Sequence, residues 1–342
     1  MVLDHPGLLH NQLDQLDRSI PASPVSCDQT LADPGRPWLC RREEEAKMTD
    51  RKIVHHSTGR WISDNEKFFL PPVCNKMMHN DQLKVFFVGG PNQRKDFHLE
   101  EGEELFYMRR GNMSLPILTE GKFRTVHIRE GEVFLLPGRI PHSPQREKDT
   151  VGLVIERERL LSETDGLRYY VGDTTETLFE RWFYCDDLGS QLKPVIEEFF
   201  ASEEYKTGAP GPTSINPSPP WVPDSQRVVG RPFNLAGWLN EHRTLISTTG
   251  SYPLFPPSSY QSDILVLGLG RGSRQVKSPS ETFLWQLEGS AVVSLGTEEF
   301  RLRQDDTLRI PGQSEFTYIP SSESVTMSVV MNPSNKQRPY NN

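Results

Sequence analysis

Positive charge, long apolar runs and cysteine are all scarce in this chain of 342 residues. It carries 38 Lys and Arg against 46 Asp and Glu, a formal net charge of −8, and its basic residues are scattered among acidic ones. A nucleic-acid interface needs a basic stripe that meets the phosphates, so we expect no nucleic-acid partner. No apolar run approaches the roughly 20 residues of a membrane span, and the first residues lack the basic and apolar segments of a signal peptide. We therefore expect no membrane partner and a cytosolic location.

The four cysteines lie far apart and form no C-x-x-C pair: Cys27, Cys40, Cys74 and Cys185. This distribution argues against a zinc ribbon and against a dense disulfide framework. Any metal site in the chain must therefore be built from histidine and carboxylate side chains.

Short segments of β-prone residues follow one another between about residues 83 and 160. Gly, Pro and Asn separate them at intervals of about ten residues, in the order LKVFFVGG, EELFYM, SLPIL, FRTVHI, EVFLLPG and VGLVIER. This pattern is typical of an antiparallel sandwich or barrel. After NLAGWLNEH, which predicts a short helix, comparable strands resume with SDILVLGLG and continue as TFLWQL, AVVSLG, EFRLR, TLRIPG and VTMSVVM.

The part of the chain between these two β regions has a different period. Apolar residues recur at three- and four-residue spacing from about 176 to 205, and Thr174 and Thr175 are available as N-caps, so a helical segment is predicted there. The next stretch, TGAPGPTSINPSPPWVP, is rich in Pro, Gly and Ser and predicts a linker. Residues 1–48 mix Pro, Ser, Asp and charge without a sustained period, which predicts a disordered extension.

The two β regions align with each other. ELFYMRRG (104–111) matches TFLWQLEG (282–289), and EGEVFLLPG (130–138) matches QDDTLRIPG (304–312), which places Pro137 on Pro311. The match is strand for strand, so the sequence predicts two homologous β domains.

Two histidines of the first copy stand at fixed intervals from glutamate, glycine and proline. The residues concerned form two series, first His98, Glu104 and Gly111, then Gly131, Pro137 and His142. Their spacing resembles the two motifs of the cupin superfamily, whose hairpins point metal ligands into one barrel interior. The resemblance implies a fold dominated by β-structure, with two cupin barrels in one chain joined by a helical segment.

The resemblance also implies three metal ligands, His98, Glu104 and His142. The usual cupin pattern has a further histidine where this chain has Glu100. Two imidazoles and one carboxylate that leave coordination positions open suit non-haem Fe(II) enzymes that use O₂, so Fe(II) is the expected cofactor, although Mn²⁺ or Ni²⁺ could occupy the same ligands.

Neighbouring carboxylates compete with Glu104 for the ligand role. Periodicity alone leaves Glu100, Glu101 and Glu103 open as alternatives, and only the motif spacing favours Glu104. On that basis Asp96, Glu101 and Glu103 are expected in a turn or at the surface.

The second copy serves as an internal control for the ligand set. In the same alignment Val276 stands for His98, Thr282 for Glu104 and Phe316 for His142. Apolar and neutral groups of this kind do not bind iron, so the C-terminal barrel is expected to be metal-free.

Three further charges lie close in sequence to the expected ligands: Arg94, Arg146 and Glu156. An arginine turned into a barrel would be costly if unpaired and tolerable if a carboxylate arrives, so two such arginines indicate an anionic substrate. Any one of the three, taken singly, could equally be a solvated surface charge.

A closer resemblance runs over about residues 60–205 and more loosely through the second barrel. The segments that carry it include PPVCNK, QLKVFFVGGPNQRKDFHLEEGEELFY, FLLPGRIPHSPQR, TVGLVIERERL, DGLRYYVGDT and RWFYCDDLGSQLKPVIEEFF. They resemble the family of 3-hydroxyanthranilate 3,4-dioxygenases, which open the ring of 3-hydroxyanthranilate with O₂ on the kynurenine route to quinolinate and NAD.

The family resemblance implies roles for individual residues. Arg94 and Arg146 would face the carboxylate of 3-hydroxyanthranilate, Glu156 would receive its amino or hydroxyl group, and Asn75 would line the pocket near substrate and oxygen. The product would be 2-amino-3-carboxymuconate semialdehyde, and the two-barrel form implies a monomer.

The expected domains are a disordered extension (1–48), a catalytic cupin barrel (49–175), a helical segment with a Pro-rich linker (176–225) and a degenerate metal-free barrel (226–342). Two alternatives remain open: a cupin dioxygenase of another small acidic metabolite, and a cupin that binds a metabolite without catalysis.

Overall fold

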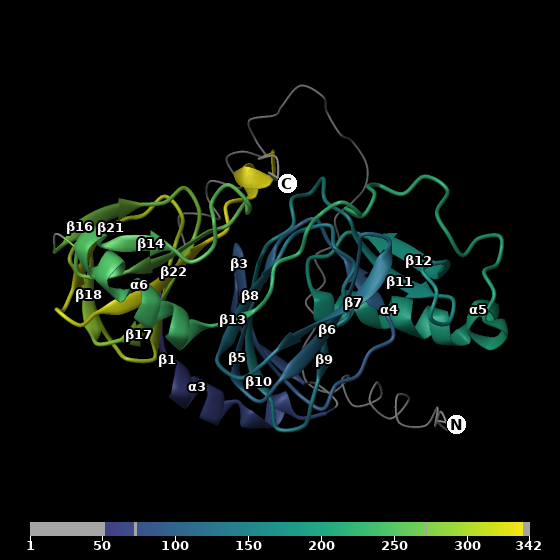
Figure 1. Cartoon of the computed structure of the whole chain (residues 1–342), viewed down its shortest axis with the longest axis horizontal. Coiled ribbons are helices and arrows are strands. Elements are labelled where there is room, and N and C mark those ends of the chain that lie inside the picture. The colour runs from purple at the N-terminus through teal and green to yellow at the C-terminus, as the bar shows by residue number, and fades with distance from the viewer. Residues whose placement is uncertain (1–51, 72–73, 271, 338–342) are drawn as a thin grey trace.

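The computed structural model describes residues 52–71, 74–270 and 272–337. Two β units lie side by side, with the earlier part of the chain in one and the later part in the other (Figure 1). The fold class predicted from the sequence, two cupin-type barrels dominated by β-structure, is confirmed. The predicted extension over residues 1–48 lies outside the described residues.

The first barrel is built from one large sheet and two small ones. The large sheet has six strands, in the order β13 (Phe233–Asn234), β8 (Glu132–Leu136), β5 (Glu104–Arg110), β10 (Val151–Arg157), β3 (Leu83–Gly89) and β2 (Asn75–Asn80). The small sheets have the orders β12 (Thr177–Phe183), β11 (Asp165–Tyr170), β4 (Phe97–Leu99) and β7 (Lys122–Ile128), β6 (Met113–Thr119), β9 (Gln145–Arg146).

The second barrel has a similar large sheet but a single smaller one. Its six-stranded sheet has the order β1 (Val54–Ser57), β20 (Asp306–Ile310), β17 (Thr282–Glu288), β22 (Val325–Val330), β15 (Asp263–Leu267) and β14 (Ser251–Pro253). The facing sheet has the order β16 (Arg274–Lys277), β21 (Glu315–Pro320), β18 (Ser290–Leu295) and β19 (Glu298–Arg303).

The strand pairing agrees with the alignment of the two halves of the sequence. In the first barrel Glu104 lies opposite Leu136, and in the second Thr282 lies opposite Ile310, its aligned equivalent. The positions of the two predicted histidine ligands are paired by an isolated bridge, and their counterparts Val276 and Phe316 are paired in β16 and β21. The same register in both halves supports a duplicated β unit.

Each large sheet takes one strand from the other half of the chain. β1 comes before the first barrel but pairs with β20, and β13 comes after the linker but pairs with β8. The two barrels therefore complete each other's sheets, and the predicted domain limits at residues 175 and 226 stay predictions.

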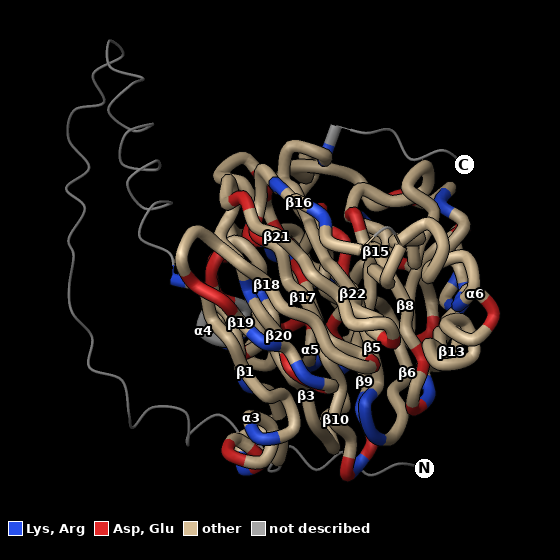
Figure 2. Tube along the Cα trace, turned by 90° about the vertical axis from the view of Figure 1, so that its left-hand side faces the viewer, with Lys and Arg blue, Asp and Glu red and all other residues tan. Residues whose placement is uncertain are grey.

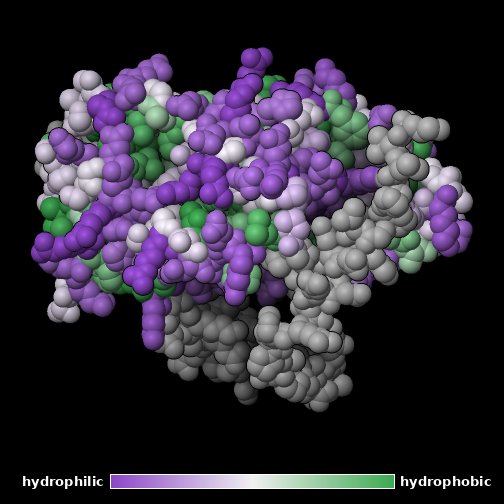
Figure 3. All heavy atoms as spheres, turned by 90° about the horizontal axis from the view of Figure 1, so that it is seen from below, coloured by the Kyte–Doolittle hydropathy of each residue, from purple (hydrophilic) through white to green (hydrophobic). Residues whose placement is uncertain are grey.

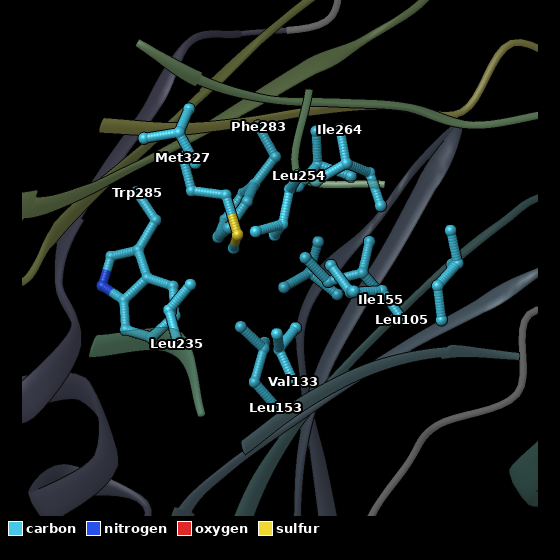
Figure 4. Close-up of a cluster of buried hydrophobic side chains, with 14 of the residues drawn as sticks. Leu105, Val133, Leu153, Ile155, Leu235, Leu254, Ile264, Phe283, Trp285 and Met327 are labelled. Carbon is cyan, nitrogen blue, oxygen red and sulfur yellow. The ribbon is translucent and has the colours of Figure 1, made fainter. Parts of the chain in front are cut away.

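The outer faces of the two large sheets share one apolar core. Leu105, Leu153 and Ile155 of the first barrel meet Phe283 and Met327 of the second, and all five are buried (Figure 4). Separate clusters fill the two barrel interiors, one around Phe106 and Met108 and the other around Phe316 and Tyr318. At about 25 cal/mol per Å² of apolar surface buried, a core of this size binds the two barrels into one body.

The helices lie around the barrels. They are α3 (Thr58–Asp64), α4 (Leu188–Ala201), α5 (Glu203–Thr207) and α6 (Leu235–Thr249), with short 3₁₀ segments η1 (Glu66–Phe69) and η2 (Pro333–Gln337). The short helix predicted from NLAGWLNEH is confirmed as α6, and Asn234 caps it by accepting a hydrogen bond from the Gly237 N–H at 2.8 Å.

The prediction of a helical segment from residue 176 was wrong at its start, because Thr177–Phe183 is strand β12. The pairs of apolar residues at 178–179 and 182–183 fit a helix period, but they also fit a strand covered on both sides. β12 pairs with β11 along its length, and α4 covers this hairpin, with the Tyr169 and Phe199 rings stacked 3.5 Å apart. Tertiary packing therefore decided the local structure.

The surface carries both signs of charge. Lys and Arg alternate with Asp and Glu along the chain in Figure 2, and no long basic stripe crosses the face shown. The face seen from below is mostly hydrophilic, with small separate apolar spots (Figure 3). None of the helices in the described part of the chain is long and apolar enough to cross a membrane.

Candidate metal centre

The two predicted histidine ligands lie on neighbouring backbone segments. His98 is the middle residue of β4, and His142 lies in the loop between β8 and β9. Their backbones pair in both directions, His98 N donating to His142 O at 2.8 Å and His142 N donating to His98 O at 3.1 Å. Both side chains are buried, with ring centres 5.3 Å apart. The antiparallel bridge thus fixes one imidazole beside the other.

Glu104 reaches the same place through the alternation of β5. Successive side chains of a strand point to opposite faces, and Glu104 is in phase with Phe106 and Met108, which pack in the first barrel's interior. Its neighbour Leu105 points to the shared core instead. Glu104 Oε2 lies 3.3 Å from His142 Nε2. The structure therefore brings together the three side chains predicted as ligands.

A fourth side chain joins them. The potential ligand atoms of His98, Glu100, Glu104 and His142 all lie within 4.8 Å of one another, and all four residues are buried. The sequence left Glu100 open only as an alternative to Glu104, although it stands where the usual cupin pattern has a histidine.

Each imidazole has one nitrogen held by an acceptor. His142 Nδ1 lies 2.9 Å from the Ile140 carbonyl oxygen, and His98 Nε2 lies 2.8 Å from Asp165 Oδ2. A neutral ring that donates from one nitrogen offers a lone pair at the other. This leaves His142 Nε2 and His98 Nδ1 as the available donor atoms.

The protonation states also suit a metal. Burial raises the pKa of Glu104, but His142, His98 and Arg159 outweigh it and bring the pKa to about 2. Burial lowers the pKa of His98 despite its contact with Asp165. An ionised carboxylate and a neutral imidazole are the forms that bind metal, and both are present at neutral pH.

Buried oxygen atoms around the cluster are left without donors. Glu100 Oε1 and Glu156 Oε2 are inaccessible to solvent and have no hydrogen-bond donor within the described residues, and Glu104 Oε2 faces His142 Nε2 at 3.3 Å. An unsatisfied buried carboxylate oxygen is costly, and a cation would satisfy it. This set of possible ligand atoms therefore fits a metal cofactor.

One arginine holds the other carboxylates in place. Arg159 is buried and contacts three acids: Glu100, Glu156 at 3.0 Å and Asp165 at 2.9 Å. Burial raises the pKa values of Glu100 and Glu156, which lessens the negative charge buried around Arg159, and the guanidinium donates to several acceptors at once.

Comparison with known proteins places the chain in a family. A family model described as 3-hydroxyanthranilic acid dioxygenase matches residues 50–200. The 3-hydroxyanthranilate 3,4-dioxygenase of Xenopus tropicalis is 52% identical over 269 residues, which cover 79% of this chain and 95% of that protein. The chain belongs to the 3-hydroxyanthranilic acid dioxygenase family.

Mammalian members of the 3-hydroxyanthranilic acid dioxygenase family are nearly as similar. The proteins of Bos taurus and Homo sapiens are 50% and 48% identical over 277 residues, which cover 81% of this chain and 96% of each relative. A solved structure of oxalate decarboxylase from Bacillus subtilis aligns over 75% of this chain and 71% of that one, at 15% identity and a TM-score of 0.41.

The two arginines that the sequence singled out differ in their surroundings. Arg94 pairs with Asp96, its Nε donating to Asp96 Oδ2 at 3.0 Å. Arg146 is buried, its Nε donates to the Gly89 carbonyl oxygen at 2.7 Å, and no carboxylate among the described residues pairs with it. Burial and the neighbouring Arg94 lower the pKa of Arg146 to about 10, which still leaves it charged at neutral pH. A buried cation without a counter-ion suits a family of enzymes with an acidic substrate.

Glu156 and Asn75 occupy contrasting positions. Glu156 is buried on β10, and burial, opposed by Arg159, raises its pKa to about 7. Asn75 is exposed at the start of β2, where its backbone lies opposite Val88. The site roles predicted for both residues stay predictions.

The expectation that Asp96, Glu101 and Glu103 lie in a turn or at the surface was wrong in its second part, because all three are buried. Glu103 accepts hydrogen bonds from the backbone N–H groups of residues 261 and 262, at 2.9 and 2.8 Å. Glu101 pairs with Arg139 at 2.6 Å and with Lys336 at 3.1 Å. The partners come from distant parts of the chain, so local sequence could not reveal them.

Two members of the centre, Arg159 and Asp165, were missed in the sequence, and Glu100 was left only as an alternative ligand. Arg159 and Asp165 follow strand β10 in a charged stretch that reads as a solvated loop. The one available signal was Glu100, whose place in the cupin spacing is that of a ligand.

Proposed function

We propose that this chain is a non-haem Fe(II) dioxygenase that opens the ring of 3-hydroxyanthranilate between C3 and C4 with O₂. The observation that carries the proposal is the buried set of two imidazoles and an ionised carboxylate, close in the same barrel to a buried arginine without a carboxylate partner among the described residues. Membership of the 3-hydroxyanthranilic acid dioxygenase family supports the same reaction.

Iron would be held by His98, Glu104 and His142, with Glu100 close by. Two imidazoles and one carboxylate that leave positions open form the ligand set of non-haem Fe(II) oxygenases. Bound Fe(II) supplies the electron density that activates O₂ and the positive charge that favours ionised substrate groups.

Arg146 would orient the substrate by binding its carboxylate. The guanidinium Nε is engaged with Gly89, which leaves the Nη atoms for a second acceptor. A planar guanidinium binds a carboxylate through two parallel hydrogen bonds and so fixes the plane of the ring. Arg94 would add positive charge nearby and, because it is already paired with Asp96, would contribute less.

Glu156 would accept a proton from the substrate. Its Oε1 contacts Arg159, while its buried Oε2 has no donor within the described residues. A carboxylate with a pKa near 7 can take up the proton of a hydroxyl or amino group and return it later at neutral pH. Asn75 would line the pocket near substrate and oxygen.

The product would be 2-amino-3-carboxymuconate semialdehyde, which cyclises unaided to quinolinate. We further propose a cytosolic monomer, because the outer face of the catalytic barrel's large sheet is already covered by the second barrel. The second barrel would be metal-free, since Val276 and Phe316 contribute to its apolar packing where the first has histidines.

The decisive assay loads the protein anaerobically with Fe(II), then follows O₂ uptake with 3-hydroxyanthranilate. Wild-type protein should consume O₂ and His98→Ala should not, while Val276→Ala, at the corresponding position of the second barrel, should behave as wild type. Absence of uptake by the loaded wild type, or undiminished uptake by His98→Ala, would refute the proposal.

A further inference from the structure

Asp165 lies directly behind one of the proposed ligands. It begins β11, which pairs with β4 so that Leu167 stands opposite His98. Its side chain is fully buried, and its Oδ2 is 2.8 Å from His98 Nε2.

We propose that Asp165, clamped by Arg159, is a positioning residue that accepts the Nε2 proton of His98 and so directs the Nδ1 lone pair at the metal. This inference rests on the metal site of the proposed function. It assigns Asp165 no contact with substrate.

Arg159 removes the freedom of the aspartate to turn. Its Nε donates to Asp165 Oδ1 and Oδ2, both at 3.2 Å, and its Nη2 donates to Oδ2 at 2.9 Å. A carboxylate held through both oxygens keeps its orientation, and the hydrogen bond it accepts then sets both the tautomer and the ring angle of the histidine.

The two imidazoles would then bind with different strengths. His142 donates to the neutral carbonyl of Ile140, whereas His98 donates to an anion. A charged acceptor makes the opposite nitrogen a stronger electron donor. His98 would therefore be the ligand whose affinity depends on a second residue.

The chain offers a matched control two residues earlier in the same segment. Arg157 and Glu163 repeat the spacing of Arg159 and Asp165, and they form a buried pair with hydrogen bonds of 2.7 and 2.6 Å. Neither residue contacts a proposed ligand. Removal of the Glu163 charge thus reproduces the loss of a buried ion pair without touching His98.

The experiment measures metal affinity rather than turnover. Asp165→Asn and Glu163→Gln proteins are titrated anaerobically with Fe(II), and with Co(II) to follow its absorption bands, and the unfolding midpoint of each metal-free protein is recorded. The asparagine should turn its carbonyl to Arg159 and its NH₂ to His98, which forces the proton onto Nδ1. We expect Asp165→Asn to weaken metal binding about 10- to 100-fold and Glu163→Gln to leave it within about twofold.

A second measurement reads the His98 tautomer in the wild-type protein. Imidazole ¹⁵N NMR of the metal-free wild-type protein, assigned with His98→Gln, should show a protonated Nε2 and an unprotonated Nδ1. A protonated Nδ1, or metal affinity that is equal in the two variants or tighter in Asp165→Asn, would overturn the inference. Failure of the wild type to bind metal would instead overturn the proposed function.

Discussion

Replacing Arg146 by glutamine should stabilise the substrate-free protein and at the same time impair substrate binding. The side chain is 8% exposed, and burial together with repulsion from Arg94 lowers its pKa well below the usual value of an arginine, to about 10. One pKa unit corresponds to about 1.4 kcal/mol, so the charged form carries a penalty of roughly 3 kcal/mol in the folded state. Because the folded pKa of this base is depressed, the penalty is fully present at neutral pH and fades only above about pH 10.

Glutamine removes the charge but keeps a donor for the Gly89 carbonyl, since its amide nitrogen falls near the position of the arginine Nε. The neutral hydrogen bond is weaker by about 1 kcal/mol, which leaves a net gain of about 1–2 kcal/mol. Loss of the charged partner of a substrate carboxylate costs about 2–5 kcal/mol, equivalent to a rise in KM of at least roughly thirtyfold.

Urea unfolding of the metal-free protein and KM from O₂ uptake test the two halves of this prediction. Arg227→Gln is the control, because Arg227 is also buried and donates to a backbone carbonyl, that of Ser259. It should leave KM unchanged. A lower stability of Arg146→Gln, or an unaltered KM, would show that Arg146 is a structural residue and refute the reasoning.

Three further predictions concern pH, metal and core. Burial lowers the pKa of His79 to about 3 in the folded protein. The unfolded chain binds a proton at this residue below about pH 6.5, whereas the folded protein does not. The free energy of unfolding is therefore highest above pH 6.5 and decreases as the pH falls towards 3. Lowering the pH from 7 to 5 should decrease the free energy of unfolding of the wild type, measured in urea, by about 2 kcal/mol, and that of His79→Gln by less. Glu104→Gln should weaken Fe(II) binding at least about tenfold in an anaerobic titration, whereas Thr282→Ala in the second barrel should not. Phe283→Ala, in the shared core, should decrease the free energy of unfolding by about 3–5 kcal/mol. In calorimetry both barrels should unfold in one transition at a lower temperature than in the wild type, and two separate transitions would contradict the shared core.

The sequence was most informative where function fixes spacing. The intervals around His98, Glu104 and His142 resemble the cupin motifs, and this resemblance correctly predicted three side chains that meet in one barrel. The alignment of Thr282 with Glu104 likewise predicted the register later found in β17 and β20. Both predictions rest on the spacing of residues along the chain, which can be read directly from the sequence.

Interactions between distant segments were much less accessible. The hydrogen-bond partners of Glu103 and Asp165 lie on other strands or loops, and the sequence near either residue does not indicate them. The strand at Thr177–Phe183 was missed for the same reason, since β11 and α4 and not the local period determine its conformation. A local pattern cannot specify a buried ion pair whose second member arrives from elsewhere in the fold.

The exchange of β1 and β13 makes the association of the two barrels a unimolecular event. Each barrel lends the other an edge strand, and both lie on one chain, so dilution cannot separate them. A fragment cut at the linker would expose the apolar face and an unpaired sheet edge, both of which favour aggregation. The second barrel, which has Val276 and Phe316 at the positions of the two ligand histidines, thus acts as a permanent, covalently attached subunit of the first.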